Sequence, residues 1–269
     1  MLATLPAIAF PVVDPVAFAI GPIVVRWYAL SYIVSLILGW RIAMRIARRP
    51  DSRVTPEQID GFLLWATLGV VLGGRLGYVL FYNLDRYLQY PAEIFAVWQG
   101  GMSFHGGMLG VIIAMLLYAR RIGVPFFTLM DPIACVAPIG LFFGRLANFI
   151  NGELWGRVAP EVPWAMVFPT GGPEPRHPSQ LYQAAMEGVL LFLLLNGLRW
   201  TTKVMDKPGI LSGVFLIGYG TARIVGELFR QPDPQIGYLI GGTTMGQWLS
   251  LPMVLGGIGL VLWARRQPA

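Results

Sequence analysis

The sequence contains a single cysteine and two histidines, and only 13% of its 269 residues are charged. One cysteine cannot form an internal disulfide, which excludes a disulfide-stabilised secreted domain. The low charge, together with a hydrophobic content of 55%, also excludes a disordered chain and an ordinary soluble domain. Long apolar runs and a mean hydropathy of +0.61 instead indicate an all-α protein embedded in a membrane.

Seven stretches are apolar enough, and close enough to about 20 residues, to form membrane-spanning helices. The third is the weakest, because it begins in the glycine-rich segment 100–110. We expect a seven-span domain over residues 23–269, preceded by an interfacial segment, 1–22. That segment has four prolines and lacks the basic start of a secretory signal, so we expect it to stay attached. The predicted spans are 23–46, 60–82, 103–119, 129–150, 179–200, 209–229 and 245–264.

Lys and Arg are distributed unequally among the predicted loops. Twelve of the 20 follow the first, third, fifth and seventh spans, five lie on the other side and three lie within spans. Because short loops rich in Lys and Arg stay in the cytoplasm, the N-terminus is predicted outside and the C-terminus in the cytoplasm. This topology explains the net charge of +6 without a nucleic-acid partner. The loop 151–177 falls on the outer side, where we expect a small ordered cap.

The three arginines within spans, Arg75, Arg145 and Arg223, all fall in the outer third of the membrane. An arginine in a span is costly unless it faces a cavity and has a partner, so each is a candidate functional residue. The alternative is that each reaches separately to the outer headgroups. Arg223, Glu227 and Arg230 are spaced i, i+4 and i+7, which places a cation, an anion and a cation on one helical face.

The two histidines, His105 and His177, lie at the outer ends of the third and fifth spans. Glycines around His105 allow close backbone approach, and amide groups near a helix N-terminus favour an anion. Near the outer end of the fourth span, Arg145 is followed by Asn148 and Glu153. Together these groups predict one pocket that faces the outer leaflet and has excess positive charge. A lipid phosphate is the predicted ligand, because guanidinium groups match phosphate oxygens bidentately.

Residues 144–157, GRLANFINGELWGR, resemble the signature of the prolipoprotein diacylglyceryl transferase family. Further blocks resemble the family's other motifs in the same order, so the similarity spans about residues 20–265. These blocks are RWY at 26–28, GGRLGY at 73–78, HGG at 105–107, HPSQLY at 177–182, and the stretch from Tyr219 through Arg223 and Glu227 to Arg230, Gln231, Pro232 and Asp233.

The resemblance implies a seven-span transferase of the bacterial cytoplasmic (inner) membrane that begins lipoprotein maturation. Such an enzyme moves the sn-1,2-diacylglyceryl group of phosphatidylglycerol to the lipobox cysteine of a prolipoprotein signal peptide and releases glycerol phosphate at the outer leaflet. No cofactor, metal or nucleic acid is expected. The reacting thiol belongs to the substrate, so Cys135 is interpreted as a packing residue. The family's polar residues correspond to Tyr28, His105, Arg145, Asn148, Glu153, Gly156, Tyr219, Arg223, Glu227 and Arg230.

Alkylation of sulfur requires cations for the departing phosphate and a way to deprotonate a thiol. We expect Arg145 and Arg223 to hold the phosphate, while Arg230 guides the headgroup or screens Glu227. His105 is the candidate base. A second interpretation gives it a binding role, if guanidinium charge lowers the thiol pKa enough that no dedicated base is needed.

Asn148, Glu153 and Tyr28 are expected to orient the arginines or the headgroup hydroxyls. For Glu153 the structural alternative is that it only ties Arg145 or Arg157. Gly156 is expected to matter for backbone shape.

Arg75 is the weaker candidate for substrate binding. Its structural alternative is to pair with Glu187 or with a carbonyl and so hold helices together. Whether Arg75 binds substrate or holds helices together therefore depends on which group it contacts.

Two other functions compete with the transferase. An intramembrane protease would use Ser103 with His105 or Ser179 with His177, but neither pair has a nucleophile signature. A transporter for an organic anion would need polar groups near the midplane and on both sides, whereas these cluster toward one face.

Overall fold

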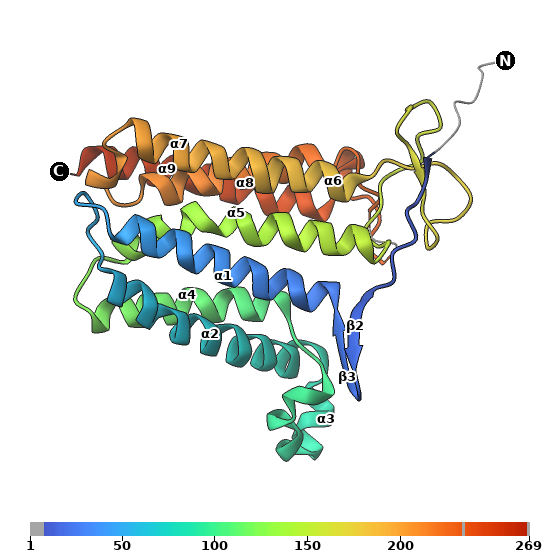
Figure 1. The fold of residues 1–269 in the computed structure, drawn as a ribbon, viewed down its shortest axis with the longest axis horizontal. Coiled ribbons are helices and arrows are strands. Elements are labelled where there is room, and N and C mark those ends of the chain that lie inside the picture. The colour runs from blue at the N-terminus through green and yellow to red at the C-terminus, as the bar shows by residue number, and fades with distance from the viewer. Residues whose placement is uncertain (1–7, 233–234, 268–269) are drawn as a thin grey trace. The chain divides into compact units, whose positions relative to one another are not determined.

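The computed structural model describes residues 8–232 and 235–267, which are mainly helical with two small sheets (Figure 1). Residues 1–7 of the predicted interfacial segment, Asp233 of the motif that ends the resemblance, and positions 268–269 lie outside the described residues. The chain divides into two compact units, Met1–Ile42 with Ile133–Ala269, and Ala43–Pro132. Each unit is described by itself.

The smaller unit, Ala43–Pro132, is built on two long helices. They are α2 (Pro56–Tyr82) and α4 (Phe104–Arg121). The Thr55 side chain caps α2 by accepting from the backbone N–H of Gln58, and Ser103 caps α4 by accepting from that of Gly106. Between the helices the chain forms α3 (Leu84–Gln89) and the 3₁₀ turns η1 (Pro91–Phe95) and η2 (Val97–Gln99).

Glycines allow α2 and α4 to pack backbone against backbone. Gly69, Gly73 and Gly77 recur every fourth residue on α2 and face Gly106 and Gly110 on α4. A Cβ added at Gly77 would lie 2.8 Å from the Cα of Gly106, and one added at Gly73 would lie 2.8 Å from the Cα of Gly110. Such spacing of small residues is the usual basis of close helix packing in membranes. The glycines that made the third span look weak therefore form its packing face.

The larger unit begins with β1 (Ile8–Ala9) and a hairpin of β2 (Val16–Ile20) and β3 (Ile23–Arg26). Helix α1 (Trp27–Ala47) starts directly after the hairpin, four residues later than predicted, because residues 23–26 pair as a strand. Most of α1 and α5 belongs to this unit. Its other helices are α5 (Phe126–Ile150), the continuous run of α6 (Ser179–Gln183), the π-helical η3 (Ala184–Leu190) and α7 (Leu191–Thr201), then η4 (Val204–Asp206), α8 (Ile210–Gly226), η5 (Ile240–Gly242) and α9 (Met245–Arg266).

Helices α8 and α9 pack closely, again through glycine (Figure 1). A Cβ added at Gly213 would lie 2.9 Å from the carbonyl O of Gly257. The loop 151–177 is folded: its strand β4 (Met166–Val167) pairs in parallel with β1. The Phe168 ring is fully buried and lies 5.2 Å from that of Phe10. The N-terminal strand therefore helps to hold the loop in place.

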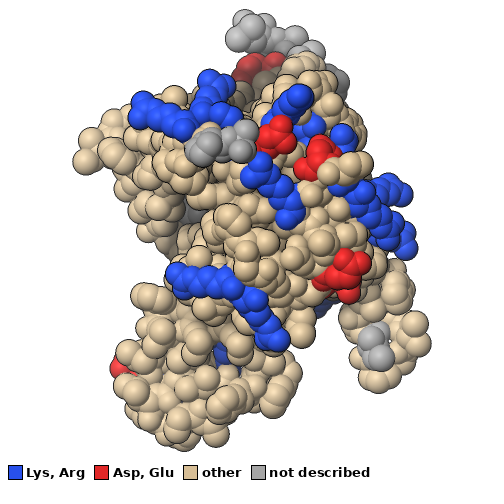
Figure 2. Space-filling model, turned by 90° about the vertical axis from the view of Figure 1, so that its left-hand side faces the viewer, with Lys and Arg blue, Asp and Glu red and all other residues tan. Residues whose placement is uncertain are grey.

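Among the residues that the structure describes, five helical segments are long and apolar enough to cross a membrane: α1, α2, α5, the α6 to α7 run, and α9. α8 is apolar but has 17 residues, and α4 is not among the five. The protein is therefore helical and multi-pass, and helices occupy all seven predicted segments. Lys207 Nζ donates to the carbonyl O of Arg265 at 2.8 Å, near the end of α9. Figure 2 views the molecule from this end, where the charged atoms are mainly those of Lys and Arg.

Candidate active site

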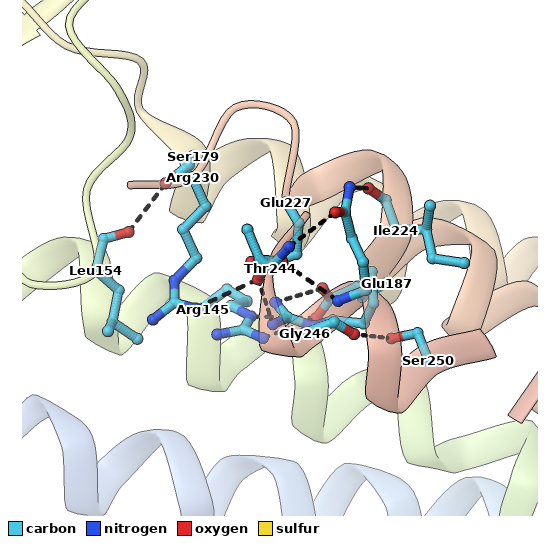
Figure 3. A network of polar contacts seen from close by, with 12 residues as sticks. Arg145, Leu154, Ser179, Glu187, Ile224, Glu227, Arg230, Thr244, Gly246 and Ser250 are labelled. Carbon is cyan, nitrogen blue, oxygen red and sulfur yellow. Dashed lines mark hydrogen bonds and ion pairs between the residues drawn. The ribbon is translucent and has the colours of Figure 1, made fainter. Parts of the chain in front are cut away.

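Arg145 and Arg223 meet at one buried carboxylate in the larger unit (Figure 3). Arg145, on α5, donates from Nε and Nη2 to Glu187 Oε2, both at 3.1 Å. Arg223 Nη1, on α8, lies 3.5 Å from Glu187 Oε1. Glu187 therefore joins two arginines that lie far apart in the sequence.

A second carboxylate, Glu227, joins Arg223 to Arg230. Its Oε1 accepts hydrogen bonds of 2.6 Å from Arg223 Nη2 and 3.3 Å from Arg230 Nη1. The i,i+4 contact predicted between Arg223 and Glu227 is confirmed. Gly246, at the start of α9, leaves room for the carboxylate, because a Cβ there would lie 2.7 Å from Glu227 Cδ. Helix α5, the η3 stretch, and the end of α8 with the residues just after it thus build one arginine cluster: Arg145, Glu187, Arg223, Glu227 and Arg230.

The position of Glu187 follows from local backbone structure. It lies in the π-helical stretch η3, and single π-helical turns are frequent at functional sites. The next residue, Gly188, packs against α5, since an added Cβ would lie 2.6 Å from the Cβ of Phe142. Phe142 precedes Arg145 by about one helical turn. The close contact therefore brings α5, and Arg145 with it, to the carboxylate.

Burial differs between the two signs of charge in the arginine cluster. The side chains of Glu187 and Glu227 are 0% and 1% exposed, whereas those of Arg145, Arg223 and Arg230 are 17%, 13% and 12% exposed. Three guanidinium groups and two carboxylates carry one net positive charge by formal count. The carboxylates hold the guanidinium groups from the buried side. The exposed edges of the guanidinium groups are left to bind an anion.

The segment around Gly156 joins the folded loop to the end of α8. Gly156 N–H donates to the His177 carbonyl at 2.9 Å, and Arg157 N–H donates to the Phe229 carbonyl at 2.8 Å. A Cβ at Gly156 would lie 2.5 Å from the His177 carbonyl O, so no side chain fits without a backbone shift. Arg157 Nη2 also donates to the Glu227 carbonyl at 2.9 Å. These contacts support the predicted role of Gly156 in backbone shape.

Asn148 and Glu153 contact each other. Asn148 Nδ2 donates to Glu153 Oε1 at 2.8 Å, and Asn151 Nδ2 donates to the same oxygen at 3.3 Å. The alternative in which Glu153 ties Arg145 or Arg157 is wrong, because the structure pairs both guanidinium groups with other residues.

Leu154 has a φ of +60°, and within the described ranges it is the only residue other than glycine with a positive φ. L-residues rarely adopt this conformation unless their surroundings hold it. Ser179 Oγ donates to the Leu154 carbonyl at 2.9 Å (Figure 3), and Gln180 Nε2 donates to the Glu153 carbonyl at 2.7 Å. The start of α6 therefore fixes the loop that follows Asn148.

His177 faces Tyr182, with its Nδ1 3.1 Å from the Tyr182 Oη. Burial lowers the pKa of His177 from its ordinary value of 6.5, and the charge of Arg157 lowers it further, while Glu161 raises it. The Ser179 hydroxyl bonds a carbonyl, so its predicted protease pairing with His177 is not formed.

The two predicted tyrosines lie on different helices. Tyr28 is in the first turn of α1, where its Oη accepts from Tyr32 Oη at 3.5 Å and its carbonyl accepts from Ser31. Tyr219 lies one turn before Arg223 on α8, and its ring stacks on Phe215 with centroids 5.9 Å apart. Tyr219 therefore shares a helix face with the arginine cluster.

In the smaller unit, Arg75 is buried and bonds to carbonyl groups. Its Nε donates to Ile94 O at 2.8 Å, its Nη2 to Glu93 O at 2.5 Å and its Nη1 to Gly100 O at 2.6 Å. Of its two structural alternatives, the carbonyl contact is confirmed. Arg75 thus holds the loop that leads into α4.

His105 is the second residue of α4 and is exposed. Its ring packs edge-on against Phe104, with centroids 5.6 Å apart. The neighbouring Ser103 hydroxyl accepts the helix-capping hydrogen bond from Gly106, so it serves the helix start.

A small, partly open hollow lies beside the arginine cluster, lined by Glu227, Arg230, Thr244 and Gly246 among others. Within residues 8–232 and 235–267, no three His, Cys, Asp or Glu side chains are grouped to hold a metal ion. The guanidinium groups and carboxylates of the arginine cluster offer anion binding, and stabilisation of negative charge that develops during a reaction.

The family model described as prolipoprotein diacylglyceryl transferase matches residues 15–263. The chain belongs to this family. Among the relatives named phosphatidylglycerol–prolipoprotein diacylglyceryl transferase, that of Paramagnetospirillum magneticum is 60% identical over 98% of both chains. That of Rhodospirillum centenum is 56% identical over 96% of this chain and 94% of its own, and that of Rhizobium leguminosarum bv. trifolii is 52% identical over 100% and 97%.

The sequence argument for this family member missed Glu187 as the link between Arg145 and Arg223. The signal was present, because a carboxylate inside a predicted span is as costly as an arginine. Counted along the sequence, Glu187 falls toward the predicted outer end of the predicted fifth span, at a depth near that predicted for the arginines. Comparing buried charges of both signs by depth marks Glu187 as a candidate residue, but depth alone does not decide which arginine it pairs with.

Proposed function

We propose that this chain transfers the sn-1,2-diacylglyceryl group of phosphatidylglycerol to the lipobox cysteine of a prolipoprotein, as the first step of bacterial lipoprotein maturation. Membership of the family and the names of the relatives support this activity. The structural observation that carries it is the arginine cluster, where Arg145 and Arg223 share Glu187. Two arginines fixed around one buried carboxylate form a site for a phosphate.

The charges of the reaction explain why such a site accelerates it. The substrate thiolate attacks the glyceryl carbon next to the phosphate, so a C–S bond forms and the C–O bond breaks. The bonding electron pair leaves on the phosphate oxygen. The phosphodiester carries a single negative charge, whereas the departing phosphate monoester carries about −1.5 to −2. A site with net positive charge therefore stabilises the transition state more than the bound lipid, which is the condition for catalysis.

Within this mechanism Arg145 and Arg223 hold the phosphate and stabilise its developing charge. Arg230 guides the headgroup and screens Glu227, in keeping with their 3.3 Å contact. His105 accepts the proton of the attacking thiol, a task suited to a neutral imidazole.

The remaining predicted residues are given supporting roles. Asn148, Glu153, Tyr28 and Tyr219 orient the headgroup or the arginines, and the hydrogen bond between Asn148 and Glu153 supports this for one pair. Gly156 sets the backbone shape of the loop. Arg75 donates hydrogen bonds to carbonyl groups of the loop before α4. It therefore acts by holding this loop, rather than by touching lipid.

The proposed membrane arrangement has seven spans over residues 23–269, the N-terminus outside and the C-terminus in the cytoplasm. The helices in all seven predicted segments and the distribution of Lys and Arg support it. Residues 1–22 then lie at the outer interface, and the loop 151–177 caps the outer face. We place the protein in the bacterial inner membrane, with the active site toward the outer leaflet. The lipobox segment of the signal peptide is the partner, and no nucleic acid or cofactor takes part.

The test is turnover by the purified protein in lipid nanodiscs. Given phosphatidylglycerol and a lipobox peptide, it should release glycerol phosphate and form a thioether. Arg145→Ala and Arg223→Ala should abolish both products while the protein still inserts into membranes. Arg265→Ala, an exposed arginine at the end of α9, is the matched control and should retain activity. Near-normal turnover in either cluster variant would exclude the phosphate-binding role.

The role of His105 needs a separate variant. His105→Gln removes the base but keeps a polar side chain, so the rate should fall at neutral pH. Recovery of the rate at raised pH, where the thiol ionises unaided, is the result expected for a base, whereas an equal loss at every pH would instead assign His105 a binding role.

A further inference from the structure

Helix α6 carries two buried glutamines that the mechanism above does not use. Gln180 and Gln183 are each only 1% exposed. Gln180 Nε2 donates to the Glu153 carbonyl at 2.7 Å, but its Oε1 has no hydrogen-bond partner among the described residues. Gln183 Nε2 likewise has none there. Buried side-chain polar atoms are paired in the large majority of cases, so two unpaired amide atoms on one short helix require an explanation.

Both amides lie beside the arginine cluster. Gln183 precedes Glu187 by four residues in the same continuous helical run, which places the two side chains on one face. On its other side Gln183 meets Gly226, the residue before Glu227. A Cβ added at Gly226 would lie 3.3 Å from Gln183 Cγ and 3.6 Å from its Nε2. Gln180 lies three residues before Gln183, on the same face of this helical run.

Another buried amide in this helical run shows the contrast. Asn196, on α7, is 2% exposed. Its Nδ2 donates to the carbonyls of Cys135 and Phe192, and its Oδ1 accepts from Arg199 Nη2. Where an amide has only a structural role in this helix, both of its ends are therefore paired. Gln180 and Gln183 depart from that rule where the run meets the arginine cluster.

The chemistry of the unpaired atoms indicates what they bind. Gln180 offers an acceptor and Gln183 a donor, three residues apart on one helix. A phosphate only accepts hydrogen bonds, so the acceptor would oppose it. A hydroxyl both donates and accepts, so it satisfies both amides at once. In phosphatidylglycerol, hydroxyls are found on the terminal glycerol of the headgroup, one short spacer from the phosphate.

We propose that Gln180 and Gln183 form a hydroxyl subsite that recognises the terminal glycerol of the phosphatidylglycerol headgroup. The proposal rests on the proposed function and adds to it the basis of headgroup specificity. The arginines bind the phosphate that every phospholipid has. The two amides select the lipid whose headgroup carries hydroxyls.

The test compares two lipids and two proteins. Phosphatidylpropanol has the same phosphodiester as phosphatidylglycerol but no hydroxyls, and Gln183→Met removes the amide while it keeps nearly the same length. The wild-type protein should prefer phosphatidylglycerol in kcat/KM by about 10- to 100-fold, because a site built around a hydroxyl discriminates against an analogue without one. Gln183→Met should lose most of this preference, through slower turnover of phosphatidylglycerol and little change for phosphatidylpropanol.

Gln267→Met makes the same chemical change at an exposed position beyond the end of α9, and should keep the wild-type preference. Gln183→Asn keeps an amide but withdraws it by one methylene group, and should lose the preference as well. A Gln183→Met variant that lowers the turnover of both lipids by the same factor would have a structural role only, and the subsite would be wrong. Unchanged preference in both Gln183 variants would overturn it equally.

Lipid binding provides a readout that does not depend on turnover. A lipid that binds the folded protein raises its melting temperature, and at a given concentration the tighter-binding lipid raises it more. Phosphatidylglycerol should raise the wild-type melting temperature more than phosphatidylpropanol does, and the two should act alike on Gln183→Met. Absent turnover with this binding difference intact would refute the transferase and retain the subsite. Equal stabilisation of the wild-type protein by both lipids would refute the subsite.

Discussion

Replacement of Gly246 by alanine tests whether Glu227 must be held in place for the arginine cluster to work. An added Cβ would lie 2.7 Å from Glu227 Cδ and 2.8 Å from its Oε1. Because carbon atoms pack at about 3.5–4.0 Å, the carboxylate has to move by about 1 Å. That oxygen accepts the 2.6 Å hydrogen bond from Arg223 and the 3.3 Å bond from Arg230. A single methyl group therefore disturbs two arginines without any change in charge.

The expected loss follows from these hydrogen bonds. One to a charged group contributes about 1.5–3 kcal/mol. If the Arg223 bond is lost, and Arg223 with it leaves the phosphate, kcat/KM should fall by about 10- to 100-fold. Stability should change less, because alanine is favoured over glycine within a helix by about 0.5–1 kcal/mol, which offsets part of the strain.

Gly256→Ala is the matched control. Gly256 lies on the same helix, and a Cβ there would meet no described atom within 4 Å. Glycerol phosphate release should be measured for both variants at several phosphatidylglycerol concentrations, together with their melting temperatures. If Gly246→Ala turns over at the rate of Gly256→Ala, then the position of Glu227 does not control Arg223, and our reasoning about the arginine cluster is refuted.

Three further predictions concern other parts of the fold. Gly73→Ala should lower the melting temperature by several degrees, because the added Cβ would lie 2.8 Å from the backbone of α4. The measurement is thermal unfolding in detergent, and a variant that melts at the wild-type temperature would contradict the glycine packing. The lowered pKa of His177 means that the folded loop favours the neutral ring, so the stability of the loop is full above the ordinary pKa of 6.5 and falls as pH drops below it. Hydrogen exchange near His177, corrected for intrinsic rates, should therefore be faster at about pH 5.5 than at about pH 7.5. A pH-independent exchange rate would contradict this. Ser179→Ala should cost about 1 kcal/mol by freeing the Leu154 carbonyl, and protease cleavage of the loop should report it as faster cutting than in the wild-type protein.

Helix positions followed well from the sequence, and their ends followed less well. Apolar runs bounded by polar or Pro/Gly-rich breaks located all seven segments, because the length of a span is set by the thickness of the bilayer. The start of α1 was misplaced, since the short apolar stretch 23–25 suits a strand as well as a helix. Only the pairing partner, β2, decides between the two, and pairing is a contact that local pattern does not encode.

For the site, the spacing of residues within one helix predicted one contact. Contacts between different helices then join that pair to the rest of the arginine cluster. Arg223 and Glu227 are four residues apart, so their pairing could be read from helix geometry. The pairing of Arg145 with Glu187 depends on the π-helical stretch η3 and on the close approach at Gly188. Neither has a signature in a single sequence. The carbonyl groups around Arg75 belong to a loop whose path could not be inferred either.

The arginine cluster also has a consequence for biosynthesis, because its parts emerge from the ribosome in sequence. Arg145 is made about a hundred residues before Gly246, a delay of about 5–20 s at ordinary rates of translation. An unpaired guanidinium in hydrocarbon is costly throughout that interval. Glu187 is synthesised partway through this interval and neutralises Arg145. The surface of α9 that packs against Glu227, at Gly246, is in place only when α9 inserts. The last helix therefore closes the site, and a nascent chain that stalls before it holds its arginines without the final support.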